Sequence, residues 1–366
     1  MRPALTVAVH QFVPSLAPRD AIGAHTLATQ EVLRGMGLRS EIFADEVRPG
    51  LEGRARPYRH YGRFGRVRRG ERTHLLYQAS MGSPVADYLV ARPEPKWVYF
   101  HNITPRRLIE AWDPEIGIAS GTGWSQLGRL APGTTASFAA SKFNRYELAK
   151  VGFANPTVVP PLVELGACPP DPVTLDHLRS TRQGAELTFV GRVSPHKGQH
   201  HLIAALAAYR RAYDPGARLH LVGGSASDSY WDVLTAYAAR LDLSDGVNLA
   251  GSVSAAVLAA HYANADVFVC ASSHEGFCIP LLEAMCHGVP VVAYAAAAVP
   301  ETVGNAGLVL GSREPVVMAA GIQRVLTDEG LRASMELGAK AQLARFEPAR
   351  CRAAMAEAFR AALAEA

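Results

Sequence analysis

The chain is poor in cysteine, in long apolar runs and in charge of one sign. Five cysteines in 366 residues are too few for a disulfide-stapled fold. Cys270, Cys278 and Cys286 are spaced evenly by eight residues, which fits no common zinc pattern, so we interpret them as reduced packing residues. No apolar run reaches the roughly 18 residues of a membrane helix. The net charge of +4 gives no argument for nucleic acid as a partner.

Two short motifs are also missing. The absence of Gly-x-Gly-x-x-Gly argues against a dinucleotide-dependent dehydrogenase, and the absence of Asp-x-Asp argues against a required divalent metal. The N-terminus is too short and too strand-like for a signal peptide, so we expect a cytoplasmic protein. The length and the apolar fraction of 49% predict two globular α/β domains.

The most informative stretch is 265–293. Its apolar run from Val267 to Cys270 predicts a strand that is covered on both faces. Small and polar residues around Gly276 predict a turn after this strand. Pro280 suits the first position of a helix, and Gly288 ends that helix before a further strand. The stretch therefore predicts a strand, a tight loop, a helix and a strand.

Two carboxylates lie in this strand–loop–helix stretch. The start of a helix presents free N–H groups that attract phosphate, and ligands of open parallel sheets bind beyond the carboxyl ends of the strands. Glu275 in the loop and Glu283 in the predicted first helical turn would repel a phosphate. We expect them to accept hydrogen bonds from the hydroxyls of a ribose or a sugar. An equally good alternative is that Glu283 only complements the helix dipole.

Further candidates follow two predicted strands near the N-terminus. The strand Leu5 to Val9 precedes a predicted loop over 10–24, in which Gly23 either approaches a phosphate or simply begins a helix. Asp20 in the same loop is a candidate for contacting an acceptor. Another predicted strand, Trp97 to Phe100, is followed by His101, which either faces a cleft or is a buried histidine.

Two cations lie on a later predicted strand-to-helix loop. Arg192 and Lys197 follow the strand Glu186 to Val190, where they suit a diphosphate or are ordinary surface charges. Trp124 lies in a helical region and either lines an acceptor pocket or belongs to the core.

An arginine-rich segment runs from Arg48 to Arg72. Glycine and proline interrupt it, so we expect mostly loop. It is either a solvated surface loop or an electrostatic contact for an anionic acceptor or an anionic membrane surface. Nucleic acid is the weakest alternative, because no nucleic-acid-binding motif surrounds the segment.

The run from Glu275 to Glu283, with Gly288-Val-Pro-Val-Val behind it, resembles the E-x7-E signature of retaining GT-B glycosyltransferases of family 4, the glycosyl transferases group 1. The stretches His101-Asn-Ile-Thr-Pro and Gly191-Arg through Lys197-Gly are similar to further parts of that family. The resemblance implies an α/β fold of two doubly wound Rossmann-like domains that face a cleft. We expect an N-terminal acceptor-side domain over 1–162, a nucleotide-sugar domain over 163–347 and a C-terminal helix over 348–366 that packs back on the first domain.

The resemblance also implies the roles of particular residues. We expect His101, Arg192, Lys197 and Glu275 to serve catalysis, with Asp20 and Trp124 as acceptor candidates. The expected donor-binding residues are Gly23, Arg192, Lys197, Gly251, Val253, Glu275, Gly276, Phe277, Cys278, Ile279 and Glu283.

The expected reaction moves a sugar from a nucleotide diphosphate sugar, such as a UDP- or GDP-sugar, to a hydroxyl acceptor of unknown identity. The resemblance implies retention at the anomeric carbon, with no cofactor and no metal. A nucleotide-sugar epimerase of the same architecture and a catalytically silent nucleotide-sugar-binding protein are the alternatives.

Overall fold

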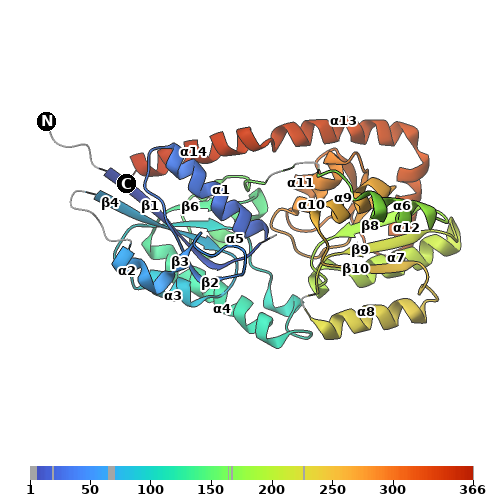
Figure 1. Ribbon diagram of the computed structural model, residues 1–366, viewed down its shortest axis with the longest axis horizontal. Coiled ribbons are helices and arrows are strands. Elements are labelled where there is room, and N and C mark those ends of the chain that lie inside the picture. Colours follow the sequence, from blue (N-terminus) through green and yellow to red (C-terminus); the bar gives the residue numbers. More distant parts are fainter. Residues whose placement is uncertain are drawn as a thin grey trace. The chain divides into compact units, whose positions relative to one another are not determined.

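The computed structural model of the chain describes residues 6–18, 20–64, 71–163, 165, 168–225 and 227–365. The chain divides into two compact units (Figure 1). Unit 1 comprises Met1–Arg106, Glu115–Glu164 and Phe346–Ala366, and unit 2 comprises Arg107–Pro114 and Leu165–Arg345. Each unit contains one parallel sheet with connecting helices, which is the doubly wound α/β architecture that the sequence predicts.

Unit 1 has a seven-stranded sheet in the order β3-β2-β1-β4-β5-β6-β7. Its strands are β1 Thr6–Leu16, β2 Ile42–Val47, β3 Arg56–Pro57, β4 Glu71–Ala79, β5 Lys96–Phe100, β6 Thr134–Ala139 and β7 Thr157–Val158. Its helices are α1 Ala21–Gly35, α2 Tyr61–Phe64, α3 Pro84–Val90, α5 Lys142–Lys150 and α14 Pro348–Ala364, with 3-10 turns η1 Tyr58–His60 and η3 Ala131–Gly133. The helix α4 Pro114–Leu130 and the 3-10 turn η2 Arg106–Leu108 each cross the boundary between the units.

Unit 2 has a six-stranded sheet in the order β10-β9-β8-β11-β12-β13. Its strands are β8 Glu186–Val190, β9 Arg218–Val222, β10 Val247–Gly251, β11 Val267–Cys270, β12 Val291–Tyr294 and β13 Gly307–Leu310. Its helices are α6 Pro172–Ser180, α7 Gln199–Ala212, α8 Asp228–Arg240, α9 Ala255–Asn264, α10 Ile279–Cys286, α11 Val299–Val303, α12 Pro315–Thr327 and α13 Glu329–Arg345, with the 3-10 turn η4 Pro195–Lys197. Figure 1 shows α7 and α8 on one side of β8, β9 and β10, and α9 on the other.

The first strand is longer than the sequence predicts. The expected strand ended at Val9 and a loop followed, whereas β1 continues to Leu16. Pairing with both β2 and β4 buries the polar residues His10 and Gln11, which local preference alone assigns to a loop. Pro14 lies beyond Phe12, the last residue paired with β4, and a proline is tolerated where a strand is paired on one side only.

The arginine-rich segment contains short ordered elements, β3, η1 and α2, where mostly loop was expected. The aromatic rings of Tyr58 and Tyr61 are buried in the core of unit 1 and anchor these elements. Six arginines of this segment are exposed among the residues that the structure describes, namely Arg48, Arg54, Arg56, Arg59, Arg63 and Arg72. Arg66, Arg68 and Arg69 lie outside the described residues. No helix in the described part of the chain is both long and apolar enough to cross a bilayer.

The C-terminal helix α14 packs within unit 1. The ring of Phe359 stacks on that of Trp97 at a centroid distance of 5.5 Å and meets Phe138 edge to face at 5.1 Å. Met355 is fully buried, and its sulfur accepts a hydrogen bond from the hydroxyl of Thr29 in α1. The apolar face of α14 is thus part of the core of this unit.

Candidate functional site

The strand order of unit 2 points to the carboxyl ends of its central strands. The chain leaves β8 toward β9 and β10 on one side, and β11, β12 and β13 continue on the other side of β8. The direction of winding therefore reverses between β8 and β11. Ligands of open parallel sheets bind beyond the carboxyl ends of the strands at such a switch point.

The loops that follow β8 and β11 touch each other beyond the carboxyl ends of these strands. The backbone N–H of Ser273 donates to the carbonyl of His196 over 2.7 Å. Gly198 has a φ of +72°, and a Cβ at this position would lie 2.4 Å from the carbonyl oxygen of Ala271. Only glycine allows this approach, which holds the two loops together.

Lys197 and Glu275 meet where these loops touch. The Lys197 ammonium donates to both carboxylate oxygens of Glu275, at 2.7 and 2.8 Å. The side chain of Glu275 is 7% exposed and that of Lys197 is 20% exposed. Burial by itself would lower the pKa of Lys197, but the Glu275 carboxylate raises it above its ordinary value. The Lys197 ammonium therefore stays protonated, and it can bind an anionic ligand.

The other cation of this loop is exposed. Within the described part of the chain, the guanidinium of Arg192 makes no hydrogen bond or ion pair, so it is available to a ligand. His196 is different: burial, and after it the charge of Lys197, holds the pKa of its imidazole well below the usual range. His196 is thus neutral and adds no charge to the loop.

Helix α10 begins beside the Lys197–Glu275 pair. Its N-cap residue Cys278 is in the left-handed region, with a φ of 69°, and no side chain caps the helix. Pro280 lies in the first turn, as expected for a residue without an N–H. The N–H of Leu281 donates to the carbonyl of Cys278 at 3.2 Å, whereas that of Ile279 has no hydrogen-bond partner among the described residues and is open to an anion.

The residues that lead into α10 are fixed by their neighbours. Phe277 is buried, and its carbonyl accepts from the hydroxyl of Thr302 at 2.5 Å. The carbonyl of Glu275 accepts from the N–H of Ala298 at 3.2 Å. Gly276 lies between them in the same loop, and Ile279 is the first residue of the helix.

The predicted position of Glu283 in the first turn of the helix is wrong. Because α10 begins at Ile279, no acidic residue lies in its first turn and Glu283 lies in the second. A complement to the helix dipole is weaker at that position. The Glu283 carboxylate accepts a hydrogen bond from the hydroxyl of Tyr262 at 2.8 Å. Burial raises the pKa of Glu283.

The expected base-binding region lies at the end of β10. Gly251 has a φ of +70°, and a Cβ there would meet no atom within 4 Å. Its carbonyl accepts from the N–H of Gly223 at 2.9 Å, and Val253 follows two residues later, half-buried. The structure thus offers backbone groups and little side-chain chemistry here.

In unit 1, a chain of hydrogen bonds sets the tautomer of His101. The carbonyl of Thr26 can only accept, and Gln11 Nε2 donates to it at 3.0 Å. Gln11 Oε1 then accepts from Gln78 Nε2 at 2.7 Å, which leaves Gln78 Oε1 to accept at 2.8 Å from His101 Nε2. The proton of His101 is therefore on Nε2, and Nδ1 is an acceptor. Burial lowers the pKa of His101 to about 3, so the ring is neutral.

The remaining predicted residues of unit 1 lie in contact with their own neighbours. Asp20 is the N-cap of α1 and accepts from the N–H of Gly23 at 2.9 Å, so these two candidates are engaged with each other. The ring of Trp124 meets Phe100 edge to face at 5.6 Å, at the border of the core. Their proposed ligand contacts stay predictions.

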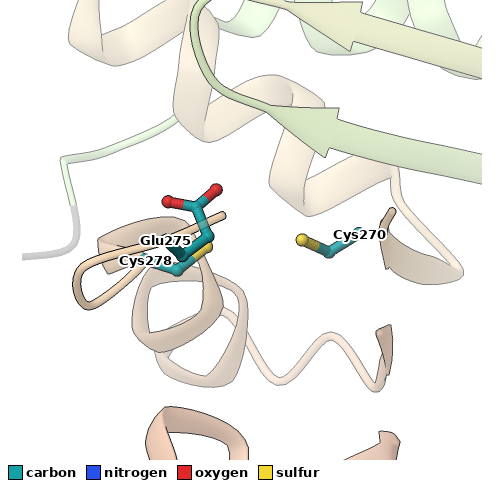
Figure 2. Close-up of side chains that lie close together, drawn as sticks. All are labelled: Cys270, Glu275 and Cys278. Atoms are coloured by element: carbon teal, nitrogen blue, oxygen red, sulfur yellow. The ribbon is translucent and has the colours of Figure 1, made fainter. Parts of the chain in front are cut away.

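Sequence reasoning missed several partners of the site residues. Tyr262 holds Glu283, and Gln11 and Gln78 orient His101, although the sequence offered none of the three as a candidate. Gln11 was expected in the loop over 10–24, and it lies in a buried strand only because β1 pairs with β4, so no local signal identified it. The interpretation of the cysteines as simple packing residues is also incomplete, because two of them surround Glu275 (Figure 2).

Part of the chain matches a known family. Residues 178–342 match the family model described as glycosyl transferases group 1. This stretch is less than half of the chain, and it contains the motifs from Gly191 to Gly198 and from Glu275 to Glu283, so the predicted resemblance to the family is confirmed for this stretch.

Curated relatives match part of the chain. A GDP-mannose-dependent alpha-(1-6)-phosphatidylinositol monomannoside mannosyltransferase of Mycobacterium tuberculosis is 34% identical over 227 residues, which are 56% of this chain and 58% of that protein. A D-inositol 3-phosphate glycosyltransferase of Salinispora arenicola is 35% identical over 172 residues, which are 45% of this chain and 38% of that protein. The chain therefore matches less than two thirds of the length of these relatives.

Solved structures match nearly the whole chain. Anabaena HepE in complex with UDP and glucose has a TM-score of 0.72 at 20% identity, covering 97% of this chain and 100% of that one. Sucrose-phosphate synthase from Thermosynechococcus elongatus has a TM-score of 0.75 at 17% identity, covering 98% of this chain and 100% of that one. These likenesses confirm the predicted GT-B fold class.

Proposed function

We propose that the protein is a retaining glycosyltransferase that moves a sugar from a nucleotide diphosphate sugar to a hydroxyl acceptor and requires no metal. The observation that carries this proposal is the Lys197–Glu275 pair at the switch point of unit 2, beside the open start of α10. A cation and a free backbone N–H at a helix start suit a diphosphate, and an adjacent carboxylate suits sugar hydroxyls.

The proposed chemistry places negative charge on a departing diphosphate. Breaking the bond between the sugar and the phosphate leaves this charge on the phosphate oxygens. Lys197, Arg192 and the free N–H at the start of α10 would stabilise it, and one such fixed donor contributes about 10²–10³ in rate. Glu275 would hold a hydroxyl of the donor sugar and orient the ring.

The other residues would position the substrates. Glu283 would bind the ribose, and His101 would accept a hydrogen bond from a sugar or acceptor hydroxyl at Nδ1. No residue is proposed as a covalent nucleophile. The departing phosphate oxygen would take the proton of the acceptor hydroxyl as the new glycosidic bond forms on the same face of the sugar.

A thermal-shift screen tests the proposal. A ligand that binds only the folded state raises its stability by RT ln(1 + [L]/Kd), about 2.7 kcal/mol at 100 times Kd. We expect one class among UDP-, GDP-, ADP- and dTDP-sugars to raise the melting temperature. The name of the mycobacterial relative favours GDP, whereas the HepE complex favours UDP. A protein that responds to no nucleotide sugar would refute the proposal. If breakdown of the donor requires an added acceptor, the protein is a transferase and not an epimerase. Any breakdown of the donor excludes a catalytically silent binding protein.

Replacing Glu283 with alanine should weaken nucleotide binding about tenfold or more. The reason is the loss of a charged acceptor for the ribose hydroxyls, since such hydrogen bonds contribute about 1.5–3 kcal/mol. Isothermal titration calorimetry with the nucleotide found by screening measures the change. Glu336→Ala is the matched control, because the Glu336 carboxylate is exposed and pairs with Lys340 on α13. Equal affinities in Glu283→Ala and the control would exclude the ribose role.

The exposed arginines support a second proposal, contact with an anionic membrane surface or acceptor. Each such cation near an anionic bilayer contributes about 1 kcal/mol. We expect the protein to sediment with vesicles rich in phosphatidylserine at low salt, and to do so less when Arg54, Arg56, Arg59 and Arg63 are replaced by glutamine. If the unaltered protein stays in the supernatant with these vesicles, the membrane proposal fails.

A further inference from the structure

Three potential metal ligands converge at the end of β11. The sulfurs of Cys270 and Cys278 and a carboxylate oxygen of Glu275 all lie within 4.8 Å of one another. Figure 2 shows the sulfur of Cys270 directed toward Glu275 and Cys278 across the loop that leads into α10. Cys270 and Glu275 are buried, and Cys278 is half-buried.

This set of donor atoms suits a soft divalent cation. Thiolates select Zn²⁺ and related ions over Mg²⁺ and Ca²⁺, and three protein ligands with an open fourth position are a common arrangement. Bond lengths of about 2.3 Å to sulfur and 2.0–2.2 Å to oxygen place tetrahedral ligand atoms about 3.5–3.8 Å apart. The three side chains would therefore need to close by only about 1 Å.

We propose that Cys270, Cys278 and Glu275 bind one Zn²⁺-like cation, and that this cation inhibits the enzyme. The metal site stands on the geometry of the three side chains alone, whereas the inhibition rests on the proposed function. The cation would occupy the carboxylate that is proposed to hold the donor sugar. It would also place two positive charges beside the Lys197 ammonium, which both oxygens of Glu275 now hold.

The neighbours of the cluster make this a site of moderate affinity. Each thiol must lose its proton to solvent, and Lys197 competes for Glu275. The apparent affinity should therefore rise with pH.

Cobalt gives a readout that does not depend on activity. Co²⁺ bound to thiolate sulfur produces charge-transfer bands in the near ultraviolet, and Zn²⁺ removes them by competition. With chelator-treated, reduced protein we expect one Co²⁺ per chain. We expect Cys270→Ser to weaken Zn²⁺ binding at least about tenfold. Cys286→Ser is the matched control, because Cys286 is exposed and lies outside the cluster.

The proposal is overturned if stoichiometric Co²⁺ gives no sulfur charge-transfer band, or if Cys270→Ser and Cys286→Ser bind Zn²⁺ as the parent protein does. A second measurement needs no variant: Zn²⁺ should slow the alkylation of Cys278 in the native protein, as read by mass spectrometry. Unchanged alkylation at saturating Zn²⁺ would also overturn it. The alkylation measurement thus tests the proposal even if the Cys270→Ser protein does not fold.

Activity provides the last arm of the test. Zn²⁺ should lower donor turnover, EDTA should restore it fully, and Cys270→Ser should be resistant. If Co²⁺ binds as expected but no nucleotide sugar is turned over, the metal site stands and the proposed function fails. If turnover is measured and Zn²⁺ binds without lowering it, the inhibition is refuted.

Discussion

Replacing Lys197 with alanine should lower donor turnover by about 10²–10³-fold, which is the contribution of one fixed donor to a developing negative charge. The Lys197 ammonium is the cation at the switch point of unit 2 and holds the Glu275 carboxylate at 2.7 and 2.8 Å. Without it, a buried carboxylate would face the departing diphosphate and repel it. Steady-state rates with the donor found by screening measure the change.

The same substitution should also destabilise unit 2, and this must be separated from the catalytic effect. Breaking a buried ion pair costs about 3–5 kcal/mol, because the remaining charge is left without a partner. The Lys197 side chain is 20% exposed, so we expect a loss of stability at the lower end of this range, about 3 kcal/mol. The double variant Lys197→Ala with Glu275→Gln should recover stability in urea without recovering turnover.

Lys340→Ala is the matched control for both measurements. Lys340 pairs with Glu336 on α13, where both side chains are more than 60% exposed, so its loss should change stability by less than about 1 kcal/mol and leave turnover unaltered. A Lys197→Ala protein that turns over donor at the rate of the control would remove Lys197 from the site.

The fold could be predicted closely where hydrophobic runs are bounded by clear breakers. The strands Glu186–Val190 in unit 2 and Trp97 to Phe100 in unit 1 are examples, since Lys96 is the only addition to the latter. The prediction failed for β1, because pairing on two sides buries His10 and Gln11 against their local preference. Such tertiary effects leave no local signal.

The site could be predicted as residues but not as contacts. Lys197 and Glu275 are 78 positions apart, and they meet only because β8 lies next to β11 in the sheet. The same holds for Tyr262 and Glu283, which α9 and α10 bring together. The eight-residue spacing of Cys270 and Cys278 fits no metal pattern, yet the turn before α10 places both sulfurs beside Glu275.

Unit 1 should lose stability as the pH falls below about 6.5, because it buries neutral histidines. Burial lowers the pKa of His101 to about 3, and burial followed by the charge of Arg39 lowers that of His10 to about 4. Burial also holds the pKa of His25 well below its usual range, and burial followed by the charge of Arg72 lowers the pKa of His74 to about 4. Above pH 6.5 the imidazoles are neutral in the folded and unfolded chains alike, so no penalty arises.

Between about pH 6.5 and 4 the unfolded chain binds protons that the folded chain does not. Each proton changes the free energy of unfolding by about 1.36 kcal/mol per pH unit, so the four histidines together contribute a slope of up to about 5 kcal/mol per unit. Urea unfolding followed at pH 7.5, 6.0 and 5.0 measures this slope.

His25→Asn provides the decisive variant, because an asparagine oxygen can replace Nδ1 as the acceptor for the N–H of Leu162, which now lies at 3.0 Å. The slope should decrease by about 1.4 kcal/mol per unit, whatever the change in absolute stability. His60→Gln, at an exposed position of the same unit, should leave the slope unaltered. If His25→Asn and His60→Gln had the same slope as the parent protein, the proton that His25 binds on unfolding would play no part in acid unfolding.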